Sequence, residues 1–317
     1  MKLIFFTPIP RQAIWGGTLI KNYFNYSWFP DKIGQSWSFS AQKDGSNLVQ
    51  GGEYKDMTLY ELWKKHPELF HSNFESLPFI VSLVAPEDDL SIQVHPDKEH
   101  AEKLGFKMGK NEAWYFIDAK KDSNIIYGHC AADENEIKEY IKQGKWNDLI
   151  RLMPVRTGDF VYIPAGKLHA LRKGNIVYEV QQATDITYRF YDYDRKDKKG
   201  MKRELHLNQA IACLTYNDKV NEAHGFPKVK QIGKTRVTYF WNDASFSITR
   251  LEIRGLSTLF FHNYQLATVI RGWGYVEGEY VSAGESFLIP YGIDELSFNG
   301  NMDIMITSEG NKDCDFG

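Results

Sequence analysis

The sequence predicts a mostly β protein with a few attached helices, and both composition and local pattern support this. Aromatic residues make up 15% of the 317 residues, and glycine occurs 25 times. Short runs of aromatic and β-branched residues alternate with Gly, Asp and Pro turns, whereas helical periodicity is rare. A chain of this length can bury the cores of two domains.

Strands are expected wherever a short apolar or alternating run ends at a turn signal. The run from Pro78 to Ala85 is almost entirely apolar and predicts a buried strand. In the stretch 91–97, alternation predicts that Gln93 and His95 point to one strand face. Further strands are expected at 112–118, 159–163, 176–181 and 186–191, with short strands again over 235–307.

Helices are expected at four places. Thr58 and Glu61 have the spacing of a capping box, and apolar residues follow at helical intervals as far as Pro67. Asp97 and Asp133 are suitable N-cap residues for two further helices. The expected helical segments are 58–66, 97–104, 133–150 and 206–216, and the charged tract 192–204 should be a solvated loop.

The composition argues against several classes of function. Lys and Arg (38) nearly balance Asp and Glu (41), so a net charge of −3 speaks against nucleic acid or an anionic membrane as partner. The apolar N-terminal run is too short for a signal peptide, and no run is long enough to span a membrane. Cys130, Cys213 and Cys314 are odd in number and widely spaced, as expected of free thiols in a reducing compartment. These features predict a soluble, cytoplasmic protein.

One supersecondary unit occurs twice in the sequence. The pattern G-x5-P-x-G begins at Gly158 and again at Gly284, and each copy contains an apolar strand before its Pro-x-Gly turn. His169 stands three residues after the second glycine of the first copy, whereas Glu295 takes that place in the second copy. No Gln-x-His stretch occurs in the second half of the chain. The second unit is therefore expected to be a metal-free structural partner of the first.

Four side chains on the predicted strands could hold one metal ion. Gln93 and His95 share a strand face, Glu112 begins another strand, and His169 follows the first glycine turn. One carboxylate and two imidazoles suit Zn, Fe, Mn or Ni and argue against Ca or Mg. The alternative is that both histidines are ordinary core residues and that the other two side chains are solvated. Their joint occurrence at this spacing favours the metal site.

These motifs resemble the cupin superfamily of small jelly-roll barrels, which carries its metal on inward-facing strand residues. The resemblance is closer to the type I mannose-6-phosphate isomerases in their short bacterial form. Five stretches occur in the order typical of that family: 14–17 (IWGG), 65–70 (KHPELF), 93–97 (QVHPD), 163–171 (IPAGKLHAL) and 187–195 (TYRFYDYDR).

The resemblance implies an enzyme that interconverts mannose 6-phosphate and fructose 6-phosphate. It implies one zinc ion per chain, bound by Gln93, His95, Glu112 and His169, and a hexose 6-phosphate as substrate. Together with the repeat, it predicts two cupin jelly-roll barrels. Residues 1–205 are expected to form the metal-binding catalytic domain with helical insertions, and residues 206–317 a second, metal-free domain.

Lys110, Glu179 and Arg189 are the candidate catalytic residues, because each matches an active-site position of the resembled family. Lys110 is expected to be the base, since a nearby cation lowers a lysine pKa towards the working range. Glu179 could relay a proton or orient the sugar hydroxyls. Arg189 lies among aromatic residues, where an arginine is costly to bury unless it meets an anion. The alternatives are that Lys110 is a solvated lysine at the strand end and that Glu179 is simply a polar strand residue. For Arg189 the alternative is an ion pair with Asp185 or Asp192.

Trp15, Lys167 and Arg195 are the candidates for substrate binding. A phosphate needs a cation or a group of backbone amides, and Lys167 or Arg195 could provide the cation. Trp15 could form a wall for the apolar face of the sugar. The alternatives are that both cations are surface charges and that Trp15 belongs to the core.

Two other functions fit the same residues less well. An Fe(II) cupin oxygenase would use two histidines and one carboxylate, but the additional Gln93 ligand and the cationic Lys110 and Arg189 favour a phosphosugar. A non-catalytic cupin that senses a sugar phosphate would keep the metal site but show no turnover.

Overall fold

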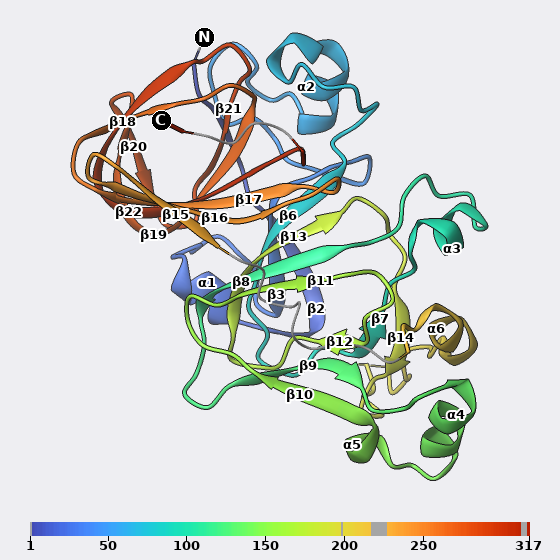
Figure 1. Cartoon of the computed structure of the whole chain (residues 1–317). Helices are drawn as coiled ribbons and strands as arrows, with labels where there is room; N and C mark the ends of the chain where they lie inside the picture. Colours follow the sequence, from blue (N-terminus) through green and yellow to red (C-terminus); the bar gives the residue numbers. More distant parts are fainter. Residues whose placement is uncertain (1, 198, 217–226, 312–315) are drawn as a thin grey trace.

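The computed structural model describes residues 2–197, 199–216, 227–311 and 316–317. It is mostly β, with antiparallel sheets and short helices around them (Figure 1). Cys130 and Cys213 are free thiols, whereas Cys314 lies outside the described residues. No helix of the described segments combines the length and the apolar character needed to cross a membrane.

Most strands belong to three sheets. The nine-stranded sheet contains, in order, β1 (Ile4–Phe6), β21 (Ser286–Ile289), β19 (Gln265–Val276), β22 (Glu295–Ser308), β17 (Ser247–Arg254), β16 (Thr235–Asn242) and β15 (Lys228–Ile232), with β18 (Ser257–Phe260) beside β22 and β20 (Glu279–Ser282) beside β19. The six-stranded sheet contains β11 (Phe160–Ile163), β8 (Glu112–Asp118), β13 (Ile176–Gln182), β6 (Phe79–Val84), β3 (Ile33–Phe39) and β2 (Ile9–Gly17). The five-stranded sheet contains β10 (Ile150–Pro154), β9 (Asn124–His129), β12 (His169–Ala170), β7 (Ile92–Val94) and β14 (Tyr188–Tyr191).

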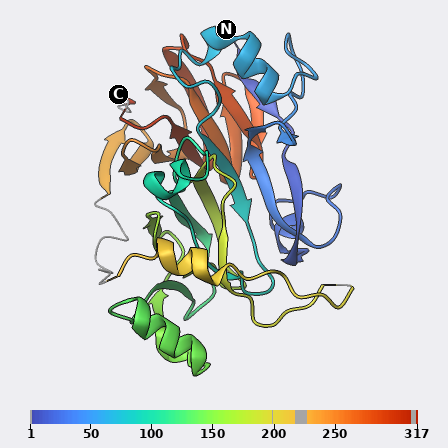
Figure 2. The same ribbon diagram turned by 90° about the vertical axis from the view of Figure 1, so that its right-hand side faces the viewer.

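The remaining elements are short. A two-stranded ribbon joins β4 (Ala41–Gln42) to β5 (Gly45–Ser46). The helices are α1 (Leu19–Tyr23), α2 (Leu59–Lys65), the 3-10 turn η1 (Pro67–Leu69), α3 (Lys98–Glu102), α4 (Glu134–Lys142), α5 (Trp146–Leu149) and α6 (Leu207–Cys213). Figure 2 shows α4 and α6 at the end of the molecule opposite α2.

The helix signals in the sequence are confirmed, with three differences in extent, the first being that α6, expected over 206–216, ends at Cys213. Thr58 and Glu61 form a reciprocal capping box at the start of α2, and Asp97 caps α3 through the backbone N–H of His100. However, α3 ends at Glu102. The segment expected over 133–150 is divided into α4 and α5, because Gly144 adopts φ 66° and ends the first of them.

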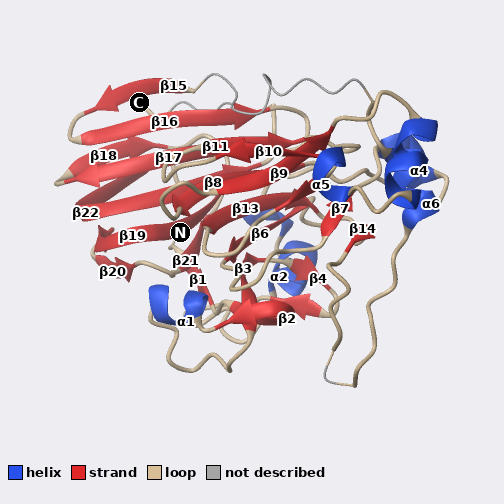
Figure 3. Cartoon of the chain, turned by 90° about the horizontal axis from the view of Figure 1, so that it is seen from below, coloured by secondary structure: helices blue, strands red, loops and turns tan. Residues whose placement is uncertain are grey.

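The six-stranded sheet lies between the other two, and alternate residues of its strands serve two cores. Ala113 and Tyr115 of β8 pack with Phe240 and Met305 of the nine-stranded sheet. Trp114 of β8 points to the other face, into the core shared with the five-stranded sheet. Helices α4, α5 and α6 pack against the five-stranded sheet and are grouped at its end near β7 and β14 (Figure 3). The polar residues of β8 that share the Trp114 face are thereby directed into the space between two sheets.

The sequence repeat corresponds to two equivalent strand pairs. The first glycines of the two copies, Gly158 and Gly284, have φ 93° and 98°. In the first copy Ile163 of β11 pairs with Glu112, and in the second copy Ile289 of β21 pairs with Gln265. Gln265 therefore takes the place of Glu112 in the second unit.

The second half of the chain has an apolar core cluster, although polar side chains such as Gln265, Thr268 and Asp303 are also buried there. Its core cluster consists of Val, Leu, Ile, Phe, Ala and Met side chains from the nine-stranded sheet, with Phe316. The strands expected there are present, but β19 and β22, with 12 and 14 residues, are not short. The division into two jelly-roll barrels at residue 206 stays a prediction. Contacts cross that boundary in both directions. The N-terminal strand β1 pairs with β21 of the nine-stranded sheet, and α6, which follows residue 206, packs against β14 of the first part.

Candidate metal centre

Three side chains of metal-ligand type meet between the six-stranded and five-stranded sheets. Glu112 is the first residue of β8, His169 is the first residue of β12, and His95 directly follows β7. One ligand atom of each lies within 4.8 Å of those of the other two, and all three residues are buried. Among the residues that the structure describes, no other group of this kind occurs. The structure thus brings three of the four expected ligands together.

Gln93, the fourth expected ligand, lies next to this group. It is directly opposite His169 in the antiparallel pair of β7 and β12, so both side chains belong to the same face of the five-stranded sheet. Its side chain is half-buried, and its Oε1 lies 3.5 Å from the Ser91 hydroxyl. This position allows the amide oxygen to complete the group.

The hydrogen bonds of the two histidines fix their tautomers. Nδ1 of His95 donates to the carbonyl of Ile186 at 2.8 Å, and Nδ1 of His169 donates to the carbonyl of Lys167 at 2.9 Å. A carbonyl oxygen can only accept, so in each neutral ring the proton is on Nδ1 and the lone pair is on Nε2. Burial lowers the pKa of His95 to about 4, which keeps this ring neutral near pH 7.

The two Nε2 atoms face the Glu112 carboxylate without bonding to it. They lie 3.2 Å and 3.3 Å from its oxygens, yet neither has a hydrogen-bond partner. Buried lone pairs at this distance from a carboxylate repel it unless a cation lies between them. Ligand atoms on one zinc ion, with bonds of about 2.0–2.1 Å, are about 3 Å apart. The donor set and its spacing therefore fit a bound metal ion.

Lys110 adds a positive charge to the centre. It precedes β8, is 8% exposed, and its Nζ lies 3.5 Å from Oε1 of Glu112. Burial opposes ionisation of Glu112, but its pKa is held well below the usual range, and the positive charge of Lys110 beside it favours the carboxylate. Glu112 is therefore a carboxylate, as a metal ligand must be.

Glu179 is held on the same face of the six-stranded sheet. Its carboxyl group accepts hydrogen bonds from Trp114 Nε1 (2.9 Å), Ser82 Oγ (2.8 Å) and Gln181 Nε2 (2.8 Å). Burial, and then the nearby Glu112 charge, raise the pKa of Glu179 in spite of these donors. A fully buried carboxyl group with a raised pKa can exchange a proton nearer to neutral pH than a solvated one.

Arg189 lies on β14, opposite Gln93 of β7. Its Nη1 donates to the carbonyl of Glu204 at 2.7 Å, while its Nε is buried without a hydrogen-bond partner. Burial, and then the charges of neighbouring arginines, lower the pKa of Arg189. No ion pair of Arg189 with Asp185 or Asp192 is present in the described part of the chain, so that alternative is wrong.

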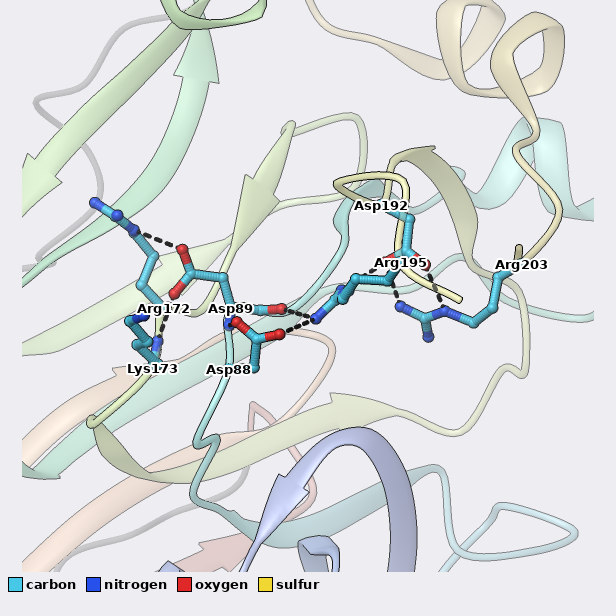
Figure 4. A network of polar contacts seen from close by, with 7 residues as sticks. All are labelled: Asp88, Asp89, Arg172, Lys173, Asp192, Arg195 and Arg203. Carbon is cyan, nitrogen blue, oxygen red and sulfur yellow. Dashed lines mark hydrogen bonds and ion pairs between the residues drawn. The ribbon is translucent and has the colours of Figure 1, made fainter. Parts of the chain in front are cut away.

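A polar network joins residues 88–89, 172–173 and 192–203 (Figure 4). Asp192 accepts hydrogen bonds from Arg203 Nε at 2.8 Å and from Arg195 Nη2 at 2.5 Å. Arg195 also donates to the carbonyl of Asp89, whose carboxylate accepts from Arg172 Nε at 3.1 Å. The members of the network are Asp88, Asp89, Arg172, Lys173, Asp192, Arg195 and Arg203.

The network changes two expectations for this tract. A solvated loop over 192–204 is wrong at its start, because Asp192 is 4% exposed and the Arg195 side chain 12% exposed. Both terminal nitrogens of Arg195 are already engaged by this network. The phosphate-binding role of Arg195 stays a prediction, and a phosphate would have to displace one of these contacts.

The charge on Asp192 gives the fold a defined acid sensitivity. Burial would raise its pKa, but the hydrogen bonds and charges of Arg203 and Arg195 outweigh burial and lower it. A carboxylate whose pKa is lower in the folded state stabilises the fold above its unfolded pKa of about 3.9. That contribution is lost as the pH falls through the lower, folded pKa.

We therefore expect Asp192→Asn to reduce the free energy of unfolding by about 1.5–3 kcal/mol at pH 7, since hydrogen bonds to a charged group are lost. The difference from wild type should shrink as the pH falls below about 4. Urea unfolding of both proteins between pH 7 and pH 3 measures this. A difference that stays constant over the whole range would contradict the assignment.

The other two substrate-binding candidates are buried. Lys167 is 4% exposed, and its Nζ lies 4.3 Å from the centre of the Tyr127 ring. Trp15 belongs to the core cluster of Val84 and Trp114 between the two sheets. The burial of Trp15 favours the core alternative, and the roles of both residues stay predictions.

Several polar residues of the site were not singled out from the sequence. Ser82 and Gln181 both donate to Glu179. Gln181 could have been found, because it stands two residues from Glu179 and therefore on the same strand face. Asn111, between Lys110 and Glu112, makes hydrogen bonds to three other segments, which no local pattern indicates.

Comparison with known proteins gives a consistent result. Residues 4–125 match the family model described as phosphomannose isomerase type I, catalytic domain. The chain is 38% identical over 311 residues to the mannose-6-phosphate isomerase ManA of Bacillus subtilis, covering 96% of this chain and 98% of the relative. It is 34% identical over 308 residues to a mannose-6-phosphate isomerase of Streptococcus mutans, covering 95% and 96%.

The fold of the chain is also similar to a solved structure. The crystal structure of the mannose 6-phosphate isomerase from Bacillus subtilis superposes with a TM-score of 0.91 at 34% sequence identity. The superposition covers 97% of this chain and 100% of that one. The similarity therefore extends over both the part that contains the ligand group and the nine-stranded sheet.

Proposed function

The chain belongs to the type I phosphomannose isomerase family and is a mannose-6-phosphate isomerase, and we propose that its reaction depends on zinc. In this reaction a proton moves within the sugar, which interconverts mannose 6-phosphate and fructose 6-phosphate. The observation that carries the proposal is the buried group in which two imidazole lone pairs face one carboxylate. The proposed ligands are Gln93, His95, Glu112 and His169. Zinc suits this set, and the isomerisation exchanges no electrons with another molecule, so a redox-inactive ion suffices.

The chemistry that zinc supplies when bound is Lewis-acid stabilisation of the negative charge that develops on the sugar oxygens. The protein must open the sugar ring and move one proton between carbon 2 and carbon 1. When a base takes the proton from carbon 2, the C–H electrons form a double bond to carbon 1, and the electrons of the carbon 1 carbonyl double bond move to its oxygen, which gains a proton, giving an enediol. Loss of the proton on the carbon 2 oxygen then forms the carbon 2 carbonyl, and the electrons of the carbon–carbon double bond take up the proton at carbon 1, which gives the ketose.

We assign the carbon-bound proton to Lys110 and the oxygen-bound proton to Glu179. Lys110 is buried beside Glu112, so its amino group is next to the proposed metal ligands. Glu179 has a raised pKa and is held rigidly by donors on both of its oxygens, which suits a group that accepts and returns a proton. These two roles divide the reaction between separate groups.

Arg189 is assigned to the developing negative charge. Its Nε is buried and has no hydrogen-bond partner, although its Nη1 is held by the Glu204 carbonyl. A prepositioned donor of this kind stabilises an anion without the reorganisation that water requires. Lys167 and Arg195 are proposed to bind the phosphate and Trp15 to contact the sugar.

We propose that the two halves of the chain divide the work at about residue 206. The segment 1–205 carries the ligands and the proton-transfer groups. The segment 206–317 contains an apolar core cluster and, in its described part, no group of metal-ligating side chains. A coupled assay of purified protein for fructose 6-phosphate formed from mannose 6-phosphate tests the proposed function. A protein that contains metal but turns over no hexose phosphate would instead favour the sensor or Fe(II) oxygenase alternatives.

A further inference from the structure

Asn111 connects the two central residues of the site to three other parts of the chain. It stands between Lys110 and Glu112, and its backbone N–H donates to Oε1 of Gln182 at 2.9 Å. Its side-chain Oδ1 accepts from the backbone N–H of Ala165 at 2.9 Å. Because that partner is a certain donor, the orientation of the amide is determined, and Nδ2 is the atom that donates to Oγ of Ser245 at 2.9 Å.

The Ala165 contact reaches the other proposed ligands. Ala165 lies in the Pro-x-Gly turn that leads to His169, and the next residue, Gly166, donates its N–H to the carbonyl of His95 at 2.8 Å. The Asn111 amide therefore links the strand of Glu112 to the segments of both histidines. A rotation of this amide would loosen the contacts among all three ligand-bearing segments.

Ser245 belongs to the second half of the chain, on the turn between β16 and β17. The carboxylate of Asp243 accepts from the backbone N–H of Ser245 at 2.7 Å and from that of Phe246 at 3.3 Å. The other oxygen of Asp243 accepts from the hydroxyl of Tyr162, on β11, at 3.2 Å. Ser245 is 9% exposed. The Ser245 hydroxyl thus reaches Asn111 from a turn that the hydrogen bonds of Asp243 hold in place, both within the turn and to Tyr162.

We propose that Ser245 is a positioning residue for the isomerase site, through which the second domain fixes the Asn111 amide and the backbone between Lys110 and Glu112. The inference rests on the proposed function of Lys110 and Glu112. It gives the second domain a part in the reaction in addition to its packing role.

Loss of the Ser245 hydroxyl leaves the Asn111 Nδ2 without an acceptor and allows the amide to rotate. Ser245→Ala should lower kcat about three- to ten-fold, the effect of one neutral hydrogen bond, while KM stays within about two-fold. The effect falls on kcat because Lys110 moves the proton, whereas other residues are proposed to hold the phosphate. Ser245→Thr keeps a hydroxyl and should restore most of kcat.

Ser247→Ala is the matched control. Ser247 is also buried and stands two residues after Ser245, at the start of β17, but its hydroxyl bonds to Ser308 at 2.7 Å within the second half of the chain. This variant should lose stability without a change in kcat. If it lowers kcat as much as Ser245→Ala does, the effect reflects general destabilisation, and the positioning role is wrong.

A double-mutant cycle with Asn111→Ala completes the test. If Ser245 acts through Asn111, the double variant should be no slower than Asn111→Ala alone. Additive losses of kcat, or a Ser245→Ala enzyme with kcat within about two-fold of wild type, would overturn the inference. Failure of the proposed function is recognised separately, because the wild-type protein would then show no turnover.

Discussion

Replacing His169 by alanine should remove the bound metal and the turnover together. His169 supplies one of two imidazole lone pairs that face Glu112, and its ring is completely buried, so no solvent group can easily substitute. The Lewis-acid contribution of a metal is several kcal/mol, so turnover should fall by about 10³-fold or more. Elemental analysis after dialysis and the coupled assay measure the two effects on the same preparation.

Glu295 provides a matched control for His169. It stands at the corresponding place of the second repeat, is exposed, and begins β22. Glu295→Gln should leave metal content and kcat unchanged and affect stability at most. An active, metal-free His169→Ala protein would reject the site, and a large specific loss of activity in Glu295→Gln would reject the proposed division of labour between the two halves of the chain.

Replacing Arg189 by alanine should lower kcat by about 10²–10³-fold, as loss of one prepositioned donor to a developing anion does. Metal content should remain intact, because the Arg189 side chain bonds to the Glu204 carbonyl and, in the described structure, to no side chain of the proposed ligands, while the backbone pairing with Gln93 is kept in the variant. The loss of turnover without loss of metal distinguishes this variant from His169→Ala. Steady-state kinetics and elemental analysis measure both properties.

Two further variants define the role of Arg189. Arg189→Lys keeps the charge but not the forked donors, so it should recover little of kcat. Arg172→Ala removes an arginine at the far end of the network in Figure 4 and should leave kcat within about two-fold of wild type. Normal kinetics of Arg189→Ala would remove Arg189 from the mechanism.

Local signals explain which parts of the fold could be predicted from the sequence. The capping box at Thr58 and Glu61 and the N-cap at Asp97 depend on residues three apart, and both are present. The apolar run within 112–118 predicts β8, and the spacing from Gly158 to His169 predicts β11 and the turn after it. In each case the determining contacts lie within a few residues of one another.

Long-range contacts explain what could not be predicted. Asn111 and Ser245 are 134 positions apart, and only the packing of the two halves brings the amide to the hydroxyl. Asp192 and Arg195 appear in a charged tract typical of a solvated loop. Arg195 nevertheless binds the Asp89 carbonyl and the Asp88 carboxylate, so the start of the tract packs against residues 88–89. The ligand group combines both cases, since resemblance identifies its members but only the strand pairing determines how they face one another.

We propose that isomerisation requires a metal ion held between the six-stranded and five-stranded sheets. The most direct test is the coupled assay on one preparation as purified, after complete chelation, and after adding back zinc, with metal content measured at each stage. Turnover should disappear with the metal and return with zinc. Undiminished turnover in protein shown to be free of metal would contradict it.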